Sequence, residues 1–321
     1  MKVDVHNHAF PEAVIGVLER NDTFGIQVKN GVISYRRWPV GHELSKSLID
    51  PAAKVRELEL AGLEGAVICV EPSLFAYDVD LEAAEALSVA ANQGMAEFCR
   101  AYPDRLWWMA QVPLQSPERA AKVLDDAARS GAVGVEIGTA VAERRPDAAE
   151  FQPFWSAVER LNIPVFAHPA YNRSHDGLNG YHLQNVIGNL LETTIFIERL
   201  ICSRTLDRHP GVRIVLAHAG GYYPFQAGRL RHAQTVRSEL REAPTDPFGY
   251  SGRVFVDTIT HDRQALQFLV SKMGPESVVM GTDLPYDMAT PSPMRALAEA
   301  VDEKTQRLIA EDNHARLFRI A

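Results

Sequence analysis

Short apolar runs alternate along the chain with longer segments of helical periodicity. The runs are rich in β-branched residues and predict strands over residues 3–8, 65–70, 106–112, 134–137, 164–168, 213–218, 253–259 and 277–283. The segments between them predict helices over residues 52–61, 80–101, 117–130, 151–161, 193–207, 223–242 and 263–273, and 291–317 can follow as one or more helices. Strict alternation of strand and helix is typical of a parallel sheet.

The number of these units favours an α/β fold, a closed (β/α)8 TIM barrel, with residues 1–321 as a single domain. An open, doubly wound sheet is the alternative. Two observations speak against it: no Gly-x-Gly-x-x-Gly turn follows the first strand, and candidate ligands follow strands one, five, six and eight. Only a closed barrel brings those four strand ends around one centre.

Three segments depart from the bare barrel. Residues 23–38 predict a small β-hairpin inserted after the first strand, with Asn30-Gly31 as its turn. A polar loop over residues 171–189 follows the fifth predicted strand, and a Pro-rich loop over residues 285–293 follows the eighth. Loops at this end of a barrel commonly carry the active site.

Composition excludes several classes of partner. The formal net charge is −8 and no cluster of Lys and Arg forms a basic arm, so we expect no nucleic-acid partner. No run of about 18 apolar residues could cross a membrane, and the first residues lack the apolar stretch of a signal peptide. We therefore expect a cytoplasmic protein with no membrane partner. Cys69, Cys99 and Cys202 show no metal-binding spacing and are interpreted as buried thiols.

Histidines and one aspartate end four of the predicted strands. His6 and His8 are two residues apart, so a strand points both to one face, with Asp4 behind them. His168 and Asp283 end the fifth and eighth strands. Three imidazoles and one carboxylate suit a single divalent metal, with zinc favoured over manganese or iron.

His218 ends the sixth predicted strand and precedes Ala219-Gly220-Gly221, where glycine lets the backbone approach a ligand. A cation nearby disfavours the protonated form of a histidine, so His218 is a candidate general acid/base rather than a fifth ligand. Asp257 either orients His218, faces the site or caps a turn.

The motifs at the strand ends also indicate a family. They are His6-x-His8, His168-Pro169, His218-x-Gly220-Gly221 and Gly281-Thr282-Asp283-x-Pro285, together with the stretches 102–105, 111–115 and 134–138. This pattern resembles the amidohydrolase superfamily, in the branch of aminocarboxymuconate semialdehyde decarboxylase and γ-resorcylate decarboxylase. The resemblance implies one metal held by His6, His8, His168 and Asp283, and catalysis by His218 and Asp283. Strand four offers Glu136 but no lysine to bridge two metals.

The resemblance further implies a small-molecule carboxylate substrate. Arg229 and Arg237 match arginines of the semialdehyde decarboxylases, and Arg237 resembles one supplied across a homodimer interface. His42 stands where those enzymes carry another substrate-binding arginine. Aromatic residues expected to form the pocket wall are Phe10, Phe75, Tyr171, Tyr222 and Tyr286, with Tyr171 also a candidate substrate contact.

These features favour a metal-dependent, non-oxidative decarboxylase of an aromatic or unsaturated carboxylic acid. The same metal and histidine could instead activate water, so a hydrolase of amides, esters or lactones, or a hydratase, is the second hypothesis. A barrel that has lost activity and only binds a partner is the non-enzymatic alternative, disfavoured because the ligands and His218 are all present.

Overall fold

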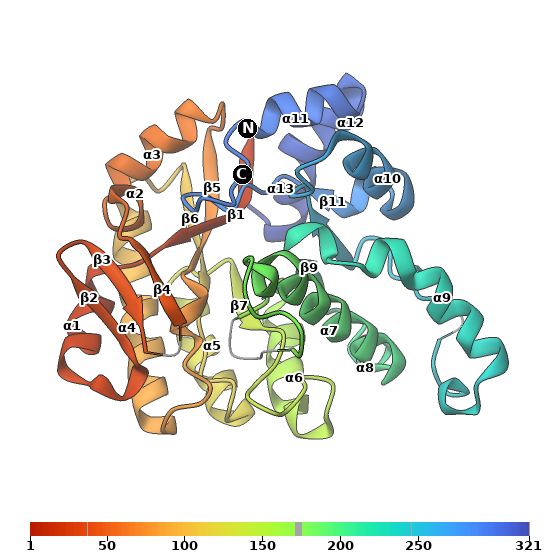
Figure 1. The fold of residues 1–321 in the computed structure, drawn as a ribbon, viewed down its shortest axis with the longest axis horizontal. Helices are drawn as coiled ribbons and strands as arrows, with labels where there is room; N and C mark the ends of the chain where they lie inside the picture. Colours follow the sequence, from red (N-terminus) through yellow and green to blue (C-terminus); the bar gives the residue numbers. More distant parts are fainter. Residues whose placement is uncertain (37, 171–174, 245, 321) are drawn as a thin grey trace.

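A parallel β-barrel forms the centre of the molecule, with helices around it (Figure 1). The computed structural model describes residues 1–36, 38–170, 175–244 and 246–320. The barrel strands are β1 (Val3–Ala9), β5 (Gly65–Val70), β6 (Leu106–Ala110), β7 (Gly134–Gly138), β8 (Val165–His168), β9 (Ile214–Leu216), β10 (Val254–Asp257) and β11 (Val278–Val279). Each pairs in parallel with the next in that order. The predicted (β/α)8 barrel is confirmed.

The first and last strands close the barrel. The backbone N–H of Val5 donates to the carbonyl of Met280 at 2.9 Å, and that of His8 donates to Leu284 at 3.0 Å. A further bond runs from the N–H of Asp283 to the carbonyl of His6 at 2.8 Å. Closure therefore places the ligand-bearing ends of β1 and of the segment after β11 side by side.

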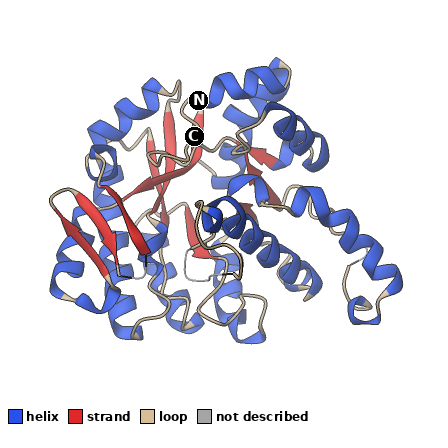
Figure 2. Cartoon of the chain, viewed as in Figure 1, coloured by secondary structure: helices blue, strands red, loops and turns tan. Residues whose placement is uncertain are grey.

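Helices cover the outside of the barrel (Figure 2). They are α1 (Glu12–Arg20), α2 (Lys46–Ile49), α3 (Pro51–Leu60), α4 (Leu81–Arg100), α5 (Pro117–Arg129), α6 (Gln152–Leu161), α7 (Leu190–Cys202), α8 (Thr205–Arg208), α9 (Tyr223–Val236), α10 (Arg263–Met273), α11 (Pro293–Ala300), α12 (Glu303–Arg307) and α13 (Asn313–Phe318). Aspartates begin several of them, as where Asp80 accepts the backbone N–H groups of Glu82 and Ala83. No helix among the described residues has both the length and the apolar character needed to span a membrane.

The predicted hairpin is present and larger than expected. Strands β2 (Ile26–Lys29) and β3 (Val32–Tyr35) flank Asn30 and Gly31, whose φ angles of 52° and 74° suit the tight hairpin turn. A third strand, β4 (Trp38–Glu43), pairs with β3 and was not predicted. The three-stranded sheet stands beside the barrel, with α1 next to it (Figure 1).

A β-bulge in β1 sets the direction of the metal-ligand candidates. The pairing of β1 with β5 shifts between Asp4 and Asn7. Before the shift Val3 and Val5 lie in the apolar cluster inside the barrel, so Asp4 between them faces the other way. The extra residue of the bulge then lets His6 and His8 both face the site. The predicted shared face of the histidines is confirmed, but the position of Asp4 behind them is wrong.

Candidate metal centre and active site

The four predicted ligands meet at the carboxyl ends of the barrel strands. One ligand atom from each of His6, His8, His168 and Asp283 lies within 4.8 Å of the others, and all four residues are buried. The Oδ1 atom of Asp283 is 3.0 Å from Nε2 of His8 and 3.3 Å from Nε2 of His6. This arrangement can hold one cation through three imidazoles and a carboxylate.

The outer nitrogen of each imidazole is already bonded. Nδ1 of His8 lies 3.0 Å from the carbonyl oxygen of Val70, and Nδ1 of His168 lies 2.7 Å from that of Pro169. A carbonyl can only accept, so both Nδ1 atoms carry the hydrogen and both Nε2 atoms present a lone pair. Nε2 of His6 and of His168 is buried with no hydrogen-bond partner among the described residues. Buried Nε2 atoms that converge without a partner fit a metal ion, which at His6 would replace a proton.

The protonation states of the buried histidines and Asp283 depend on one another. Burial disfavours the His6 cation, but Asp283 and Asp257 outweigh burial and raise the pKa of His6 to about 10. Burial would raise the pKa of Asp283, yet His6 and the neighbouring histidines hold it well below its usual range. Burial also lowers the pKa of His8 and that of His168. The site thus favours one positive charge between two carboxylates, a role that a metal ion can take from the proton.

His218 lies beside the four ligands. Its Nε2 is 3.6 Å from Oδ2 of Asp283, and its ring centre is 5.0 Å from that of His168. Nδ1 of His218 is buried without a hydrogen-bond partner among the described residues. Both His218 and Asp283 have positive φ, 54° and 67°, a conformation rare outside glycine that the surrounding bonds must hold.

Asp257 supports both the turn and the cluster. Its carboxylate accepts the backbone N–H groups of His218 at 2.8 Å and Ala219 at 2.7 Å. The same group lies 2.7 Å from Nδ1 of His6. Of the alternatives left open by the sequence, Asp257 orients the His218 turn and in addition holds a ligand.

Tyr286, in the segment after β11, connects the ligand candidate His8 with His42 of the β2–β4 sheet. The ring of Tyr286 lies between the rings of His8 and His42, with centre distances of 5.1 and 5.5 Å. The Tyr286 hydroxyl is buried and has no hydrogen-bond partner among the described residues. His42 therefore stands one aromatic ring away from a ligand histidine.

Among the described residues, neither predicted arginine contacts the four ligand candidates or His218. Arg229 is exposed on α9, and Arg237 follows the end of that helix, where its exposed side chain pairs with Glu239 at 2.7 Å. Figure 1 shows α9 extending away from the body of the molecule. Tyr171 lies outside the described residues.

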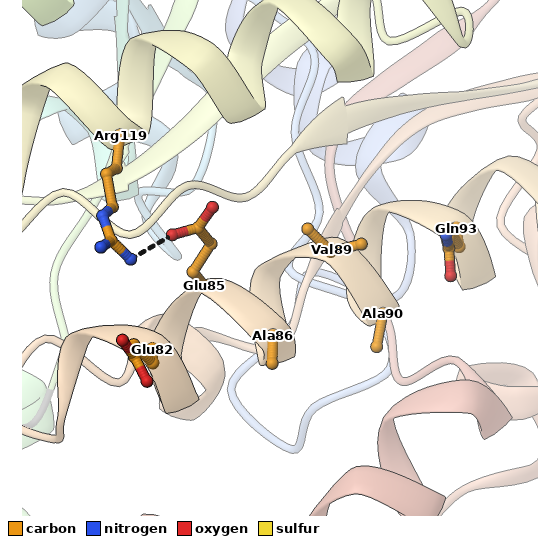
Figure 3. Close-up of a pocket in the computed structure, with 7 residues that line it drawn as sticks. All are labelled: Glu82, Glu85, Ala86, Val89, Ala90, Gln93 and Arg119. Atoms are coloured by element: carbon orange, nitrogen blue, oxygen red, sulfur yellow. Dashed lines mark hydrogen bonds and ion pairs between the residues drawn. The ribbon is translucent and has the colours of Figure 1, made fainter.

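A surface hollow lies elsewhere, on the outside of the barrel between α4 and α5. It has a volume of about 540 Å³, and an ion pair between Arg119 and Glu85 spans one end of it (Figure 3). None of the predicted site residues that the structure describes lines this hollow. The chemistry-bearing side chains gather at the barrel mouth instead.

Sequence reasoning missed two polar residues near the mouth, Tyr35 and Glu71. Glu71 directly follows the strand Gly65–Val70. An acidic residue at the carboxyl end of a barrel strand is itself a signal for the active-site face. Tyr35 gave no such signal because its position depends on how the inserted sheet packs.

Several known decarboxylases are similar to this chain in sequence or in structure. The chain is 30% identical over 254 residues to γ-resorcylate decarboxylase of Rhodococcus jostii (strain RHA1), covering 72% of this chain and 75% of the relative. It is 27% identical over 311 residues to 2-amino-3-carboxymuconate-6-semialdehyde decarboxylase of Dictyostelium discoideum, covering 94% and 86%. A solved dihydroxybenzoic acid decarboxylase of Polaromonas sp. JS666, with bound manganese and the inhibitor 2-nitroresorcinol, is 22% identical. It superposes with a TM-score of 0.80 over 99% of this chain and 96% of its own.

The amidohydrolase family model matches residues 3–320. That range contains every barrel strand and all four converging ligand candidates. The protein belongs to the amidohydrolase family.

Proposed function

We propose that this protein is a metal-dependent, non-oxidative decarboxylase, a carboxy-lyase acting on an aromatic or unsaturated carboxylic acid. The observation that carries the proposal is the buried cluster of three histidines and Asp283 with His218 beside it. Its relatives of this family in Rhodococcus jostii and Dictyostelium discoideum are named decarboxylases, which supports the same reaction class here.

The reaction needs a cation and a proton donor. A bound divalent metal would act as a Lewis acid toward the substrate carboxylate or an adjacent hydroxyl. As the bond to the carboxyl carbon breaks, CO₂ leaves and the electron pair stays on the substrate carbon, which then takes a proton. His218 Nε2, 3.6 Å from Asp283, is suited to hold that proton, and Asp283 is the second candidate. The Tyr286 hydroxyl is a free donor for the substrate at the mouth.

We assign one metal ion per chain, with zinc preferred and manganese as the alternative. Three imidazoles and one carboxylate suit zinc, and the Polaromonas relative was solved with manganese. Elemental analysis of protein prepared without chelators tests this assignment. No transition metal, or two ions per chain, would contradict it.

Hydrolysis or hydration is the second candidate function. The unpartnered Nδ1 of His218 could accept a proton from water in the same site. Whether the site decarboxylates or hydrolyses then depends on the residues that bind the substrate. These residues vary among proteins that share one fold.

The functional assembly that we propose is a homodimer in which Arg237, and Arg229 with it, serves the partner's site. Both arginines are exposed, Arg229 on α9 and Arg237 directly after it, and Arg237 pairs with Glu239 of its own chain. A guanidinium binds a carboxylate through two parallel hydrogen bonds, which suits a substrate of this class.

The deciding experiment incubates metal-loaded protein with a panel of hydroxybenzoates and measures CO₂ release. A parallel panel of amides, esters and lactones tests the second candidate. The His218→Asn variant is the matched control, since Asn keeps a polar side chain but cannot transfer the proton. Release of CO₂ that depends on metal and on His218 supports the decarboxylase. Turnover confined to the second panel would contradict it.

A further inference from the structure

Four consecutive residues with positive φ form the turn that carries His218. The φ angles are 54° at His218, 57° at Ala219, 75° at Gly220 and 63° at Gly221. Positive φ is unfavourable for residues with a side chain and normally occurs at single positions. A run of four, two of which are not glycine, therefore needs support from neighbouring elements.

The first turns of α7 support the end of this turn. The backbone N–H of Tyr222 donates to Oγ1 of Thr194 at 2.8 Å, and that hydroxyl donates to the carbonyl of Leu190 at 2.7 Å. A side chain at Gly221 would collide with the same carbonyl oxygen. The backbone after His218 thus lies directly against α7, and the turn can keep its position only while α7 keeps its own.

A buried carboxylate anchors this part of α7. Glu192 is 1% exposed. Arg145, in the segment after β7, places Nη1 2.6 Å from Oε2 of Glu192 and Nη2 3.3 Å from Oε1. Nε2 of His175, in the segment after β8, lies 2.8 Å from the same Oε1. Segments that follow two barrel strands therefore meet α7 at one carboxylate, and we call these three residues the Glu192 cluster.

The Glu192 cluster is separate from the candidate metal ligands, since none of its three members belongs to the set His6, His8, His168 and Asp283. A buried ion pair contributes little net stability compared with apolar packing, because both charges lose their water. Its geometry is nevertheless strict, so it can fix how segments lie relative to one another. Glu192 is only two residues from Thr194, which bonds the backbone after His218.

We propose that Glu192 is a positioning residue for His218. Arg145 and His175 hold Glu192, which fixes the first turns of α7. Through Thr194, α7 then holds the turn that presents His218 to the metal centre. This inference rests on the proposed function, in which His218 transfers the proton, and deepens it: proton transfer depends on an ion pair outside the site.

Residue-resolved hydrogen exchange tests the link in zinc-loaded protein. Glu192→Gln keeps the size of the side chain and removes its charge, so the Tyr222 N–H should exchange at least about tenfold faster through local opening. Glu159→Gln is the matched control, because Oε2 of Glu159 also lies near a histidine, 3.1 Å from Nδ1 of His209. It should leave exchange at Tyr222 unchanged.

Turnover gives a second readout. In Glu192→Gln, kcat should fall by about tenfold or more, since a misplacement of about 1 Å can cost about 100-fold, while KM and zinc content stay nearly unchanged. Thr194→Val leaves the Glu192 cluster intact and removes the acceptor of the Tyr222 N–H, so it should lower kcat similarly. Thr193→Val is its control, since that hydroxyl donates to the carbonyl of Asn189 at 3.1 Å instead.

Nitrogen NMR of histidine-labelled protein reads the His218 ring directly, with its signals assigned by their loss in His218→Asn. These signals should shift in Glu192→Gln and Thr194→Val and stay as in the wild type in both controls. If Glu192→Gln does not fold, Arg145→Lys, which keeps the charge but loses the two parallel bonds, takes its place.

Unchanged His218 signals in both variants, or equal changes in a variant and its control, would overturn the inference. If CO₂ release is absent but the His218 signals respond, only the proposed function fails. If CO₂ is released but neither the signals nor kcat respond, only this inference fails.

Discussion

Each of the three histidines in the candidate ligand set has a hydrogen-bond partner on the far side of its ring. His8 is held through Val70, His168 through Pro169 and His6 through Asp257. Such outer partners set both the tautomer and the ring orientation of a ligand. The metal site is therefore shaped by backbone positions of several strands as much as by the ligands themselves.

Replacing His8 with alanine should sharply lower the metal content, because three ligands hold zinc less well than four. Elemental analysis after dialysis measures the effect. His232→Ala is the matched control, since that histidine is exposed on α9. Equal metal content in wild type and His8→Ala would remove His8 from the ligand set.

The pKa of His6 predicts how metal affinity varies with pH. Because its pKa is raised to about 10 without metal, His6 carries a proton throughout the neutral range, and metal must displace it. Affinity should fall about tenfold for each unit by which pH drops from 9 to 7, the dependence of one displaced proton. Zinc competition titrations across this range give the slope. An affinity independent of pH would show that His6 is not a ligand.

His218→Asn should leave metal content intact and reduce turnover by about 10²- to 10⁴-fold, the usual contribution of a general acid/base. Steady-state rates on the substrate identified by the panel, together with elemental analysis, separate the two effects. A loss below roughly fivefold places His218 outside the mechanism. Loss of both metal and activity would make it a ligand.

The residues at the centre of the site were predictable because their types and spacing are restrictive. A His-x-His pair at a strand end and an Asp in Gly-Thr-Asp leave few other interpretations. Their supporting residues were not predictable in the same way. For Asp257 the sequence left three alternatives open, and the bond from Tyr35 to Glu71 had no signal, because both depend on the relative placement of segments far apart in the chain.

At the scale of elements, the bulge in β1 is held by one buried carboxylate. Asp4 accepts the backbone N–H of His6 at 3.0 Å, the side chain of Asn7 at 2.9 Å and the hydroxyl of Thr282 at 2.5 Å. Burial raises the pKa of Asp4 to about 6, and the hydrogen bonds from Asn7, Thr282 and His6 oppose this rise. Asp4 is therefore mainly ionised at pH 7. The bulge thus joins the first strand to the turn that carries Asp283.

Thr282→Val should lower the free energy of unfolding by about 1–3 kcal/mol, because the buried Asp4 carboxylate loses one of its donors and the backbone N–H of Leu284 loses its acceptor. Urea unfolding monitored by circular dichroism measures this change. Thr290→Val is the matched control, since the Thr290 hydroxyl is buried without a hydrogen-bond partner among the described residues. Equal destabilisation by both substitutions would show that the bond to Asp4 contributes nothing specific.

Element boundaries were less predictable than element types. The strand predicted over residues 277–283 is only Val278–Val279, because the following residues leave the ladder to form the turn that carries Asp283. The helix predicted over residues 223–242 ends at Val236, and π-helical turns at Gln184–Asn189 and Leu308–Asp312 interrupt simple periodicity. Apolar spacing indicates which face of an element is buried, but it does not show where hydrogen-bond partners change.

At the scale of the whole molecule, the proposed homodimer can be tested at Arg237. Arg237→Ala should raise KM while leaving metal content and the thermal midpoint nearly unchanged, because its side chain pairs only with the neighbouring Glu239 among the described residues. Steady-state kinetics and thermal unfolding measure these quantities.

Mixing Arg237→Ala with His218→Asn tests whether the site is shared. Each variant alone should be weak or inactive, and heterodimers should regain one intact composite site. Activity that does not return although subunits exchange would place Arg237 within its own chain or outside the mechanism. Size-exclusion chromatography with light scattering establishes the assembly independently.

Closure of the barrel between β1 and the segment after β11 also determines when the metal centre can exist during synthesis. During synthesis His6 and His8 precede Asp283, which follows His8 by 275 residues. A nascent chain therefore exposes two histidines without their carboxylate partner, and it holds a cation weakly. The full set of four candidate ligands therefore comes together only when the barrel closes.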